Sequence, residues 1–291
     1  MKSSGSLQTP TSGLNRRQLF RLMLGTAVTA FWGGGTARGE TPGDSPKGAA
    51  SLSAAPEEEV GPYYIDLERF RKDITEGKPG LPLRLRVKLV DTMTGRPLEG
   101  AALDIWHCDA RGFYSGYTAN NPDGGSGGGP GGFKGPPPPP MGNGGFGPLG
   151  AGQHPPMPKP TDSLTFLRGV QLTDREGEAE FITIYPGWYA GRDIHIHLRV
   201  HVGGVLARGR YQRGSICHTG QLFFPPAVSD EVLTLEPYAG RSGRRTTQQE
   251  DHVFTQQHGE ECLLSLQPLP GGGYVGSITL GVDPAARPTE I

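Results

Sequence analysis

The sequence predicts an all-β fold, namely an antiparallel β-sandwich with long connecting loops. Apolar and polar residues alternate with a period of two in the most apolar segments, and this period is typical of half-buried strands. Gly, Pro and Asp residues that favour turns separate these segments. Stretches with helical periodicity are scarce, so a sandwich is favoured over a sheet in which strands alternate with helices.

The expected strands follow in chain order. The first is 83–91, where leucine and valine alternate with charged residues, and the turn TGRPLEG at 94–100 separates it from a second strand at 101–106. The alternation continues after a long gap, in the segments RGVQLT (168–173), AEFITIY (179–185), IHIHLRVHV (194–202) and YVGSITLGV (274–282). Alternation at 101–106 is expected to point Trp106 toward the core of the sandwich.

The N-terminal residues 1–39 are typical of an export signal. Arg16 and Arg17 precede an apolar run of 11 residues at 22–32, which is shorter than the ~20 residues that cross a bilayer. Paired arginines before such a run resemble a twin-arginine signal, so we expect a periplasmic or secreted protein. The alternative is a chance arginine pair before an uncleaved anchor.

Two further segments have the composition of flexible chain. Residues 40–56 lack apolar periodicity and are expected to form a linker, which leaves 57–291 as a single domain. Within that domain, 121–160 contains 14 Gly and 12 Pro in 40 residues. Such a composition cannot build a core, so this low-complexity insertion is expected on a surface loop. A Pro-rich docking site is the alternative.

Charge and cysteine content limit the function classes. The formal net charge is −1, which gives no indication of a nucleic-acid partner or of an acidic membrane surface. We expect no membrane partner once the signal is removed. Cys108, Cys217 and Cys262 lack the CxxC spacing of zinc or thiol-redox sites, and we interpret them as structural, with one disulfide possible in an exported protein.

The segment 194–202 places histidines on one face of a strand. His195 and His197 point to the face opposite Ile194 and Ile196, and their Cα atoms are expected about 6.6 Å apart, so both imidazoles could bind one metal ion. Solvent-facing histidines would explain the pattern almost as well. Tyr189 precedes His195 by six residues across a turn that contains Gly, so its phenol could fold back toward the imidazoles.

Two other tyrosines are candidates for the same site. Tyr114 lies in a turn beyond the end of the second expected strand, between Gly112 and Gly116. Tyr185 is a competing phenol four residues before Tyr189. Since alternation makes Tyr185 part of the sheet, we favour Tyr189.

Taken together, these segments resemble the intradiol ring-cleavage dioxygenases, particularly the protocatechuate 3,4-dioxygenase side of that family. The resemblance spans 57–282, interrupted by the insertion. It depends on GPYYID (61–66), DIWHCDARGFYSGY (104–117), FITIYPGWYAGRDIHIH (181–197) and TGQLFF (219–224). The resemblance implies a β-sandwich of the intradiol dioxygenase type.

The resemblance also implies an Fe(III) cofactor and the residues that serve it. The iron ligands would be Tyr114, Tyr189, His195 and His197. Tyr189 would also act in catalysis, as the ligand that a catecholic substrate displaces. Arg192 and Gln221 would be catalytic donors, and Pro62 and Tyr63 would line the substrate pocket. With O2, the enzyme would cleave a small catecholic ring between its two hydroxyl-bearing carbons and form a muconate-type diacid.

Hard ferric iron suits this donor set, because anionic phenolate oxygens are hard ligands and a bound cation lowers the pKa of a phenol. Two alternatives belong to other classes. One is a non-catalytic β-sandwich module that binds aromatics or polysaccharide. The other is a metal-dependent hydrolase that uses His195, His197 and a water molecule, although no acidic general base is evident beside that pair. The turn between Tyr189 and His195 is shorter than in the protocatechuate enzymes, which leaves the ring substituents of the substrate open.

Overall fold

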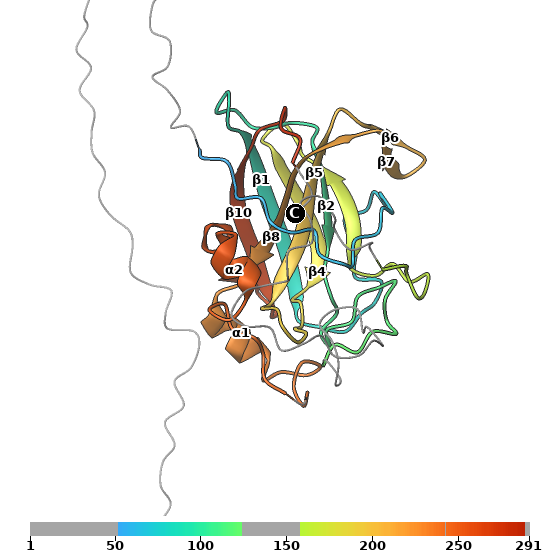
Figure 1. Ribbon diagram of the computed structural model, residues 1–291, viewed down its shortest axis with the longest axis vertical. Helices are drawn as coiled ribbons and strands as arrows, with labels where there is room; N and C mark the ends of the chain where they lie inside the picture. The colour runs from blue at the N-terminus through green and yellow to red at the C-terminus, as the bar shows by residue number, and fades with distance from the viewer. Residues whose placement is uncertain (1–51, 124–157, 242, 289–291) are drawn as a thin grey trace, which may run out of the picture. The chain divides into compact units, whose positions relative to one another are not determined.

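The computed structural model describes residues 52–123, 158–241 and 243–288 (Figure 1). The predicted export signal lies outside the described residues, as do most of the predicted linker and of the Gly/Pro-rich insertion. The elements in chain order are β1 (Pro82–Asp91), β2 (Ala102–Trp106), β3 (Arg168–Leu172), β4 (Glu178–Ile184), β5 (His195–Val202), β6 (Val205–Ala207), β7 (Arg210–Gln212), β8 (Ser215–Phe223), α1 (Pro226–Val232), α2 (His252–Gln256), the 3-10 helix η1 (Gly259–Cys262), β9 (Ser265–Pro268) and β10 (Tyr274–Val282).

Two four-stranded sheets form the sandwich, with the strand orders β4-β1-β10-β9 and β3-β2-β5-β8, and β6 and β7 form a separate hairpin. The all-β prediction is therefore confirmed. Neighbouring strands run antiparallel, except that β1 and β10 pair in parallel. Short turns join β6 to β7 and β9 to β10, and such hairpins are necessarily antiparallel, whereas β1 and β10 come from opposite ends of the domain and can pair in parallel. None of the helices in the described part of the chain is long and apolar enough to span a membrane.

The main core lies between the two sheets and follows the predicted alternation. In β1, every second side chain from Leu83 to Leu89 is buried, and Ile196, Leu198 and Val200 of β5 join them in one apolar cluster. The strand boundaries predicted from periodicity agree with β1, β2, β3, β4, β5 and β10 to within one residue at each end. The nine-residue strand β8 was not among the strands predicted from alternation, and the short strands β6, β7 and β9 have too few residues to show a periodic pattern.

The opposite face of the sheet β3-β2-β5-β8 carries polar side chains that are also buried. On β5 these side chains are each at most 7% exposed, namely His195, His197, Arg199 and His201. The three histidines therefore do not face solvent. The chain segment 57–71 covers this face, drawn in blue in Figure 1. Glu58 donates its backbone N–H to Thr219 of β8, and Glu57 contacts His218 Nδ1 at 2.7 Å.

The interpretation of Trp106 changes with this arrangement, whereas the interpretation of the three cysteines as structural residues does not. Trp106 is buried, but it lies on the polar face beside His197 and not in the main core, where Ile105 points instead. The predicted orientation of Trp106 was therefore wrong by one residue in the alternation, which inverts the face. The three cysteines Cys108, Cys217 and Cys262 are buried free thiols.

The buried Glu58 of this covering segment is expected to make the stability of the protein depend on pH. Burial raises the pKa of Glu58 to about 9, whereas the carboxyl of an unfolded chain titrates near pH 4.3. Its contribution to stability is therefore present below about pH 4 and is lost as the pH rises toward about 9. We expect thermal unfolding to show that Glu58→Gln is more stable than the wild type at pH 9 and about equally stable at pH 5. Parallel Tm curves across this range would contradict the prediction.

Candidate metal centre

Four side chains from three parts of the chain meet on the polar face of the second sheet. His195 and His197 come from the start of β5, Tyr114 from the turn after β2, and Tyr189 from the loop between β4 and β5. Each is at most 5% exposed. Tyr114 and Tyr189 also belong to one aromatic cluster with Tyr63.

The four donor atoms converge on one point. His195 Nε2 lies 3.0 Å from His197 Nε2, 3.2 Å from Tyr189 Oη and 3.4 Å from Tyr114 Oη. Two ligands that bind the same transition ion at about 2.0–2.1 Å, with angles between about 90° and 109°, lie about 2.8–3.4 Å apart. The observed separations therefore match the edges of a coordination shell.

The tautomer of His195 supports this interpretation. His195 Nδ1 lies 2.6 Å from the backbone carbonyl oxygen of Asp193, and a carbonyl only accepts, so Nδ1 carries the proton. His195 Nε2 therefore presents a lone pair to the three other donor atoms. One lone pair cannot satisfy three close neighbours by hydrogen bonding, whereas a cation among them would satisfy all four. The residues present thus fit a metal ion with nitrogen and phenolic oxygen ligands.

The protonation states of the site agree with metal binding. Burial lowers the pKa of His195 and of His197, so both imidazoles are neutral ligands. Burial also raises the pKa of the Tyr114 and Tyr189 phenols well above their usual value. Their ionised forms therefore require a cation at this position.

His197 is held by packing on both sides. The Trp106 ring stacks on it with centroids 5.0 Å apart and an interplanar angle of 1°. Its Nδ1 has no hydrogen-bond partner among the described residues, so no bond at this atom fixes the ring, and the stacked Trp106 ring contributes to its orientation. Gly61 approaches from the covering segment in a left-handed conformation, with φ +68°. A Cβ atom there would lie 2.9 Å from His197 Cε1.

This contact predicts that Gly61→Ala displaces the His197 ring and weakens metal binding. The backbone conformation alone is expected to cost about 1 kcal/mol or more of stability. Gly203→Ala is the matched control, because Gly203 has a similar φ of +73° and open space where the Cβ would lie. We expect both variants to lose Tm but only Gly61→Ala to lose bound iron, measured per chain. Equal iron contents would contradict the role of the contact.

The Tyr114 turn is anchored by a buried arginine. Arg168 of β3 donates from Nε to Ser115 Oγ at 2.8 Å and from Nη2 to the Ser115 carbonyl at 2.7 Å. Ser115 Oγ in turn donates to the Phe166 carbonyl. Asp109 accepts from two backbone N–H groups of the same turn, those of Arg111 and Phe113. These bonds fix the residue next to Tyr114 against the sheet.

Arg192 and Gln221 lie together beside the four donors. Arg192 Nη2 donates to Gln221 Oε1 at 2.6 Å, and Gln221 Nε2 donates to the Glu59 carbonyl at 2.8 Å. Gln221 pairs with His197 across β5 and β8. Gln221 therefore holds Arg192 in place through its Oε1 atom, and its role as a catalytic donor stays a prediction. Burial alone would lower the pKa of Arg192, but Tyr189 and Asp251 raise it, so the guanidinium stays charged.

The other predicted residues are placed as follows. The Tyr63 ring stacks on Tyr114 with centroids 4.5 Å apart and is buried. Pro62 is half-buried in the turn between Gly61 and Tyr63. Tyr185 lies in the main core and not with the four donors, and its Oη is 2.7 Å from Ser229 Oγ. The choice of Tyr189 over Tyr185 therefore agrees with the geometry, while the roles of all these residues remain predictions.

Sequence reasoning missed two acidic residues that contact Arg192. Asp251 accepts from Arg192 Nε at 3.0 Å and 3.1 Å, one distance for each oxygen, and Glu59 Oε1 lies 3.4 Å from Arg192 Nη1. Asp251 precedes the short segment HVFTQ (252–256), and an Asp before a helical segment is a recognisable N-cap. Its contact with Arg192 joins residues 59 positions apart, and no local sequence pattern predicts such a contact.

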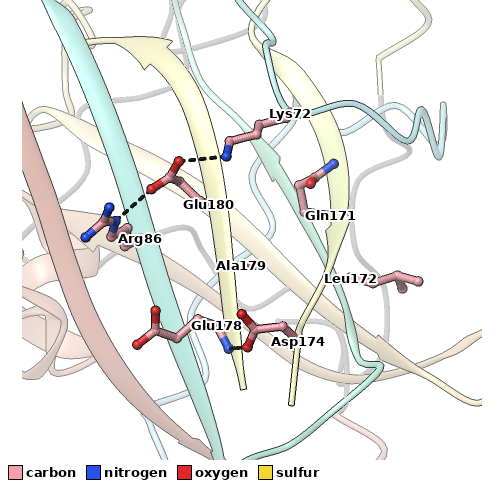
Figure 2. Close-up of a pocket in the computed structure, with 8 residues that line it drawn as sticks. All are labelled: Lys72, Arg86, Gln171, Leu172, Asp174, Glu178, Ala179 and Glu180. Carbon is pink, nitrogen blue, oxygen red and sulfur yellow. Dashed lines mark hydrogen bonds and ion pairs between the residues drawn. The ribbon is translucent and has the colours of Figure 1, made fainter. Parts of the chain in front are cut away.

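A polar surface pocket elsewhere contains none of these residues. Figure 2 shows it between β3 and β4, where Glu180 lies 2.8 Å from Lys72 Nζ and 2.7 Å from Arg86 Nε. The carboxylate of Glu180 is thus paired with two cations. We assign this pocket no role.

Comparison with solved structures identifies the family. An intradiol ring-cleavage dioxygenase from Tetranychus urticae is 30% identical to this chain, with a TM-score of 0.63, over 81% of this chain and 98% of the other. The chain belongs to the intradiol ring-cleavage dioxygenases. A second solved structure, described as a dioxygenase, is 28% identical, with a TM-score of 0.62, over 82% of this chain and 98% of the other. No protein-family model and no curated protein matches the chain.

Membership in the intradiol dioxygenases identifies the chain as a ring-cleaving enzyme and not as a non-catalytic binding module. The aligned structure covers almost the whole length of its relative, so the match is to a complete domain. The four converging side chains lie within this domain. They are the candidate active site of this dioxygenase.

Proposed function

We propose that the chain is an exported Fe(III) intradiol dioxygenase that opens small catecholic rings between the two hydroxyl-bearing carbons and forms a muconate-type diacid. The observation that carries this proposal is the convergence of Tyr114, Tyr189 and His197 on His195 Nε2, at 3.0–3.4 Å. Two phenolates and two neutral imidazoles would leave ferric iron with a charge of +1. That residual charge would favour a catechol, whose two adjacent hydroxyls can ionise and chelate a hard cation.

When bound, ferric iron would accept both oxygens of the catechol as ligands and would supply the electron-withdrawing charge that makes the ring reactive toward O2. The protein residues prepare this site before substrate arrives. Asp193 keeps the proton of His195 on Nδ1, and Trp106 fixes the plane of His197. Preorganised ligands of this kind avoid the cost of reorganisation during the reaction.

Tyr189 has the position of a proton acceptor. It lies in the loop between β4 and β5 and not in a strand, so its side chain can move without breaking a sheet. In our proposal, Tyr189 would help to hold the metal before substrate arrives, and its phenolate oxygen would take the proton of one catechol hydroxyl as the substrate binds. The buried, charged Arg192 would then stabilise the negative charge that builds on the substrate during the reaction.

The proposal is tested by analysing the full chain purified after export. We expect iron to be the principal metal, a red colour from tyrosinate bound to ferric iron, and O2 uptake when catechol, hydroxyquinol or protocatechuate is added in an oxygen electrode. The ring-opened acid is then identified by mass. A colourless zinc protein that consumes no O2 with any of the three would contradict the proposal.

Export is a separate part of the proposal, supported by Arg16, Arg17 and the apolar run that follows them. We expect cell fractionation to find the wild-type protein outside the cytoplasm and the double variant Arg16→Lys/Arg17→Lys inside it. A change of both arginines keeps the charge and removes the arginine pair. Equal distribution of the two proteins would contradict a twin-arginine signal.

A further inference from the structure

A single buried carboxylate joins two parts of the candidate metal centre. Asp251 is 0% exposed and comes from the loop before α2, far along the chain from the ligands. Its Oδ1 accepts from Arg192 Nε at 3.0 Å and from the Val253 backbone N–H at 2.9 Å. Its Oδ2 accepts from Arg192 Nε at 3.1 Å and from the Asp193 backbone N–H at 2.8 Å.

The bond to Asp193 extends the influence of Asp251 to a metal ligand. Asp193 donates its backbone N–H to Asp251, and its backbone carbonyl accepts from His195 Nδ1 at 2.6 Å. A shift of this backbone would therefore move the carbonyl away from the imidazole. His195 could then carry its proton on Nε2, and this tautomer cannot bind a metal through Nε2.

The bond to Arg192 has a second effect. Arg192 is buried, and its remaining contacts are Gln221 at 2.6 Å and the half-buried Glu59 at 3.4 Å. Among the described residues, Asp251 is the one fully buried carboxylate that lies within ion-pair distance of this guanidinium. Removal of its charge leaves a buried cation without its main partner, and such a change is strongly unfavourable.

We propose that Asp251 is a positioning residue of this dioxygenase. It fixes the position of the Arg192 guanidinium and the tautomer of His195. Asp251 contacts none of the four donor atoms, so it acts through Arg192 and through the backbone of Asp193. The inference rests on the proposed iron chemistry for its catalytic effect, whereas the tautomer of His195 is independent of iron.

The first test measures the tautomer in metal-free wild-type protein by 15N NMR of the histidine side chains. We expect His195 to carry its proton on Nδ1, and Asp251→Asn to populate the Nε2–H form as well. A wild-type His195 with its proton on Nε2 would overturn the proposal, and this measurement does not require a folded variant. It also remains decisive if the wild type proves to bind no iron, in which case the proposed function fails separately.

The second test compares Asp251→Asn with Thr173→Val in the iron-loaded enzyme. Thr173 is buried and bridges Ala101 N–H, at 3.0 Å, and the Leu98 carbonyl, at 2.5 Å, beside the start of β2, so this control lowers stability at the opposite end of β2 from Trp106. We expect Asp251→Asn to release iron to a chelator about 10- to 100-fold faster, to shift the visible absorption band and to lower kcat more than it changes KM. Thr173→Val should keep the wild-type band and kcat per iron. If the two variants behave alike in all three, Asp251 is structural only and the proposal is overturned.

Discussion

Tyr189→Phe is expected to bleach most of the visible colour of the iron-loaded protein and to lower kcat with catechol by about 100-fold or more. The substitution removes only the phenol oxygen, which lies 3.2 Å from His195 Nε2, and keeps the ring in its buried aromatic cluster. Colour and rate are expected to fall together because, in our proposal, the same oxygen would be a ligand to iron and the acceptor of the catechol proton. Visible spectra and oxygen uptake per iron are the measurements.

Tyr185→Phe is the matched control for this prediction. Tyr185 is an equally buried phenol in the same loop region, but its Oη bonds to Ser229 at 2.7 Å in the main core. We expect this variant to lose about 1 kcal/mol of stability from the broken hydrogen bond and to keep its colour and its kcat. If Tyr189→Phe keeps both colour and rate, the ligand assignment is wrong.

Trp106→Ala is expected to lower the free energy of unfolding by about 3–5 kcal/mol, the usual cost of truncating a buried aromatic residue. For a domain of this size, such a loss corresponds to a fall of about 10 °C in Tm. Iron affinity should fall as well, because the cavity would let the His197 ring rotate out of its stacked position. Thermal unfolding and competition with a chelator measure the two effects.

Trp106→Phe separates stacking from general packing. A phenyl ring can still stack on His197 and contact Tyr64, whose ring centroid lies 4.9 Å from that of Trp106. We therefore expect a smaller loss of stability and nearly normal iron affinity. Iron affinity in Trp106→Ala that equals that of the wild type would show that stacking on Trp106 does not hold His197.

The local parts of the fold were predictable because they depend on alternation within one segment. The bounds of β10 were predicted to the residue, and those of β5 to within one. The parallel pairing of β1 with β10 was not predictable, since it joins strands at opposite ends of the domain. The position of Trp106 failed for a related reason: the last residue of a strand can be assigned to either face when the register is uncertain by one.

The candidate site shows the same division between local and long-range information. His195 and His197 share a face because of strand geometry, and family motifs pointed to Tyr114, Tyr189 and Arg192. Asp251 has a local signal only as a helix cap. Its contact with Arg192 depends on how the C-terminal loops return to the second sheet, and a single sequence carries no local pattern for such a return.

The position of β10 in the first sheet determines when, during synthesis of the chain, this sheet can close. The strand lies between β1 and β9, and among the described strands it is the last to be synthesised. The middle of this sheet therefore stays open until translation of the domain is essentially complete, and the many contacts between distant residues slow its closure. In our proposal of a twin-arginine signal, the chain would be carried across the membrane only after folding, which is compatible with an order of synthesis in which the central partner of β1 is made late.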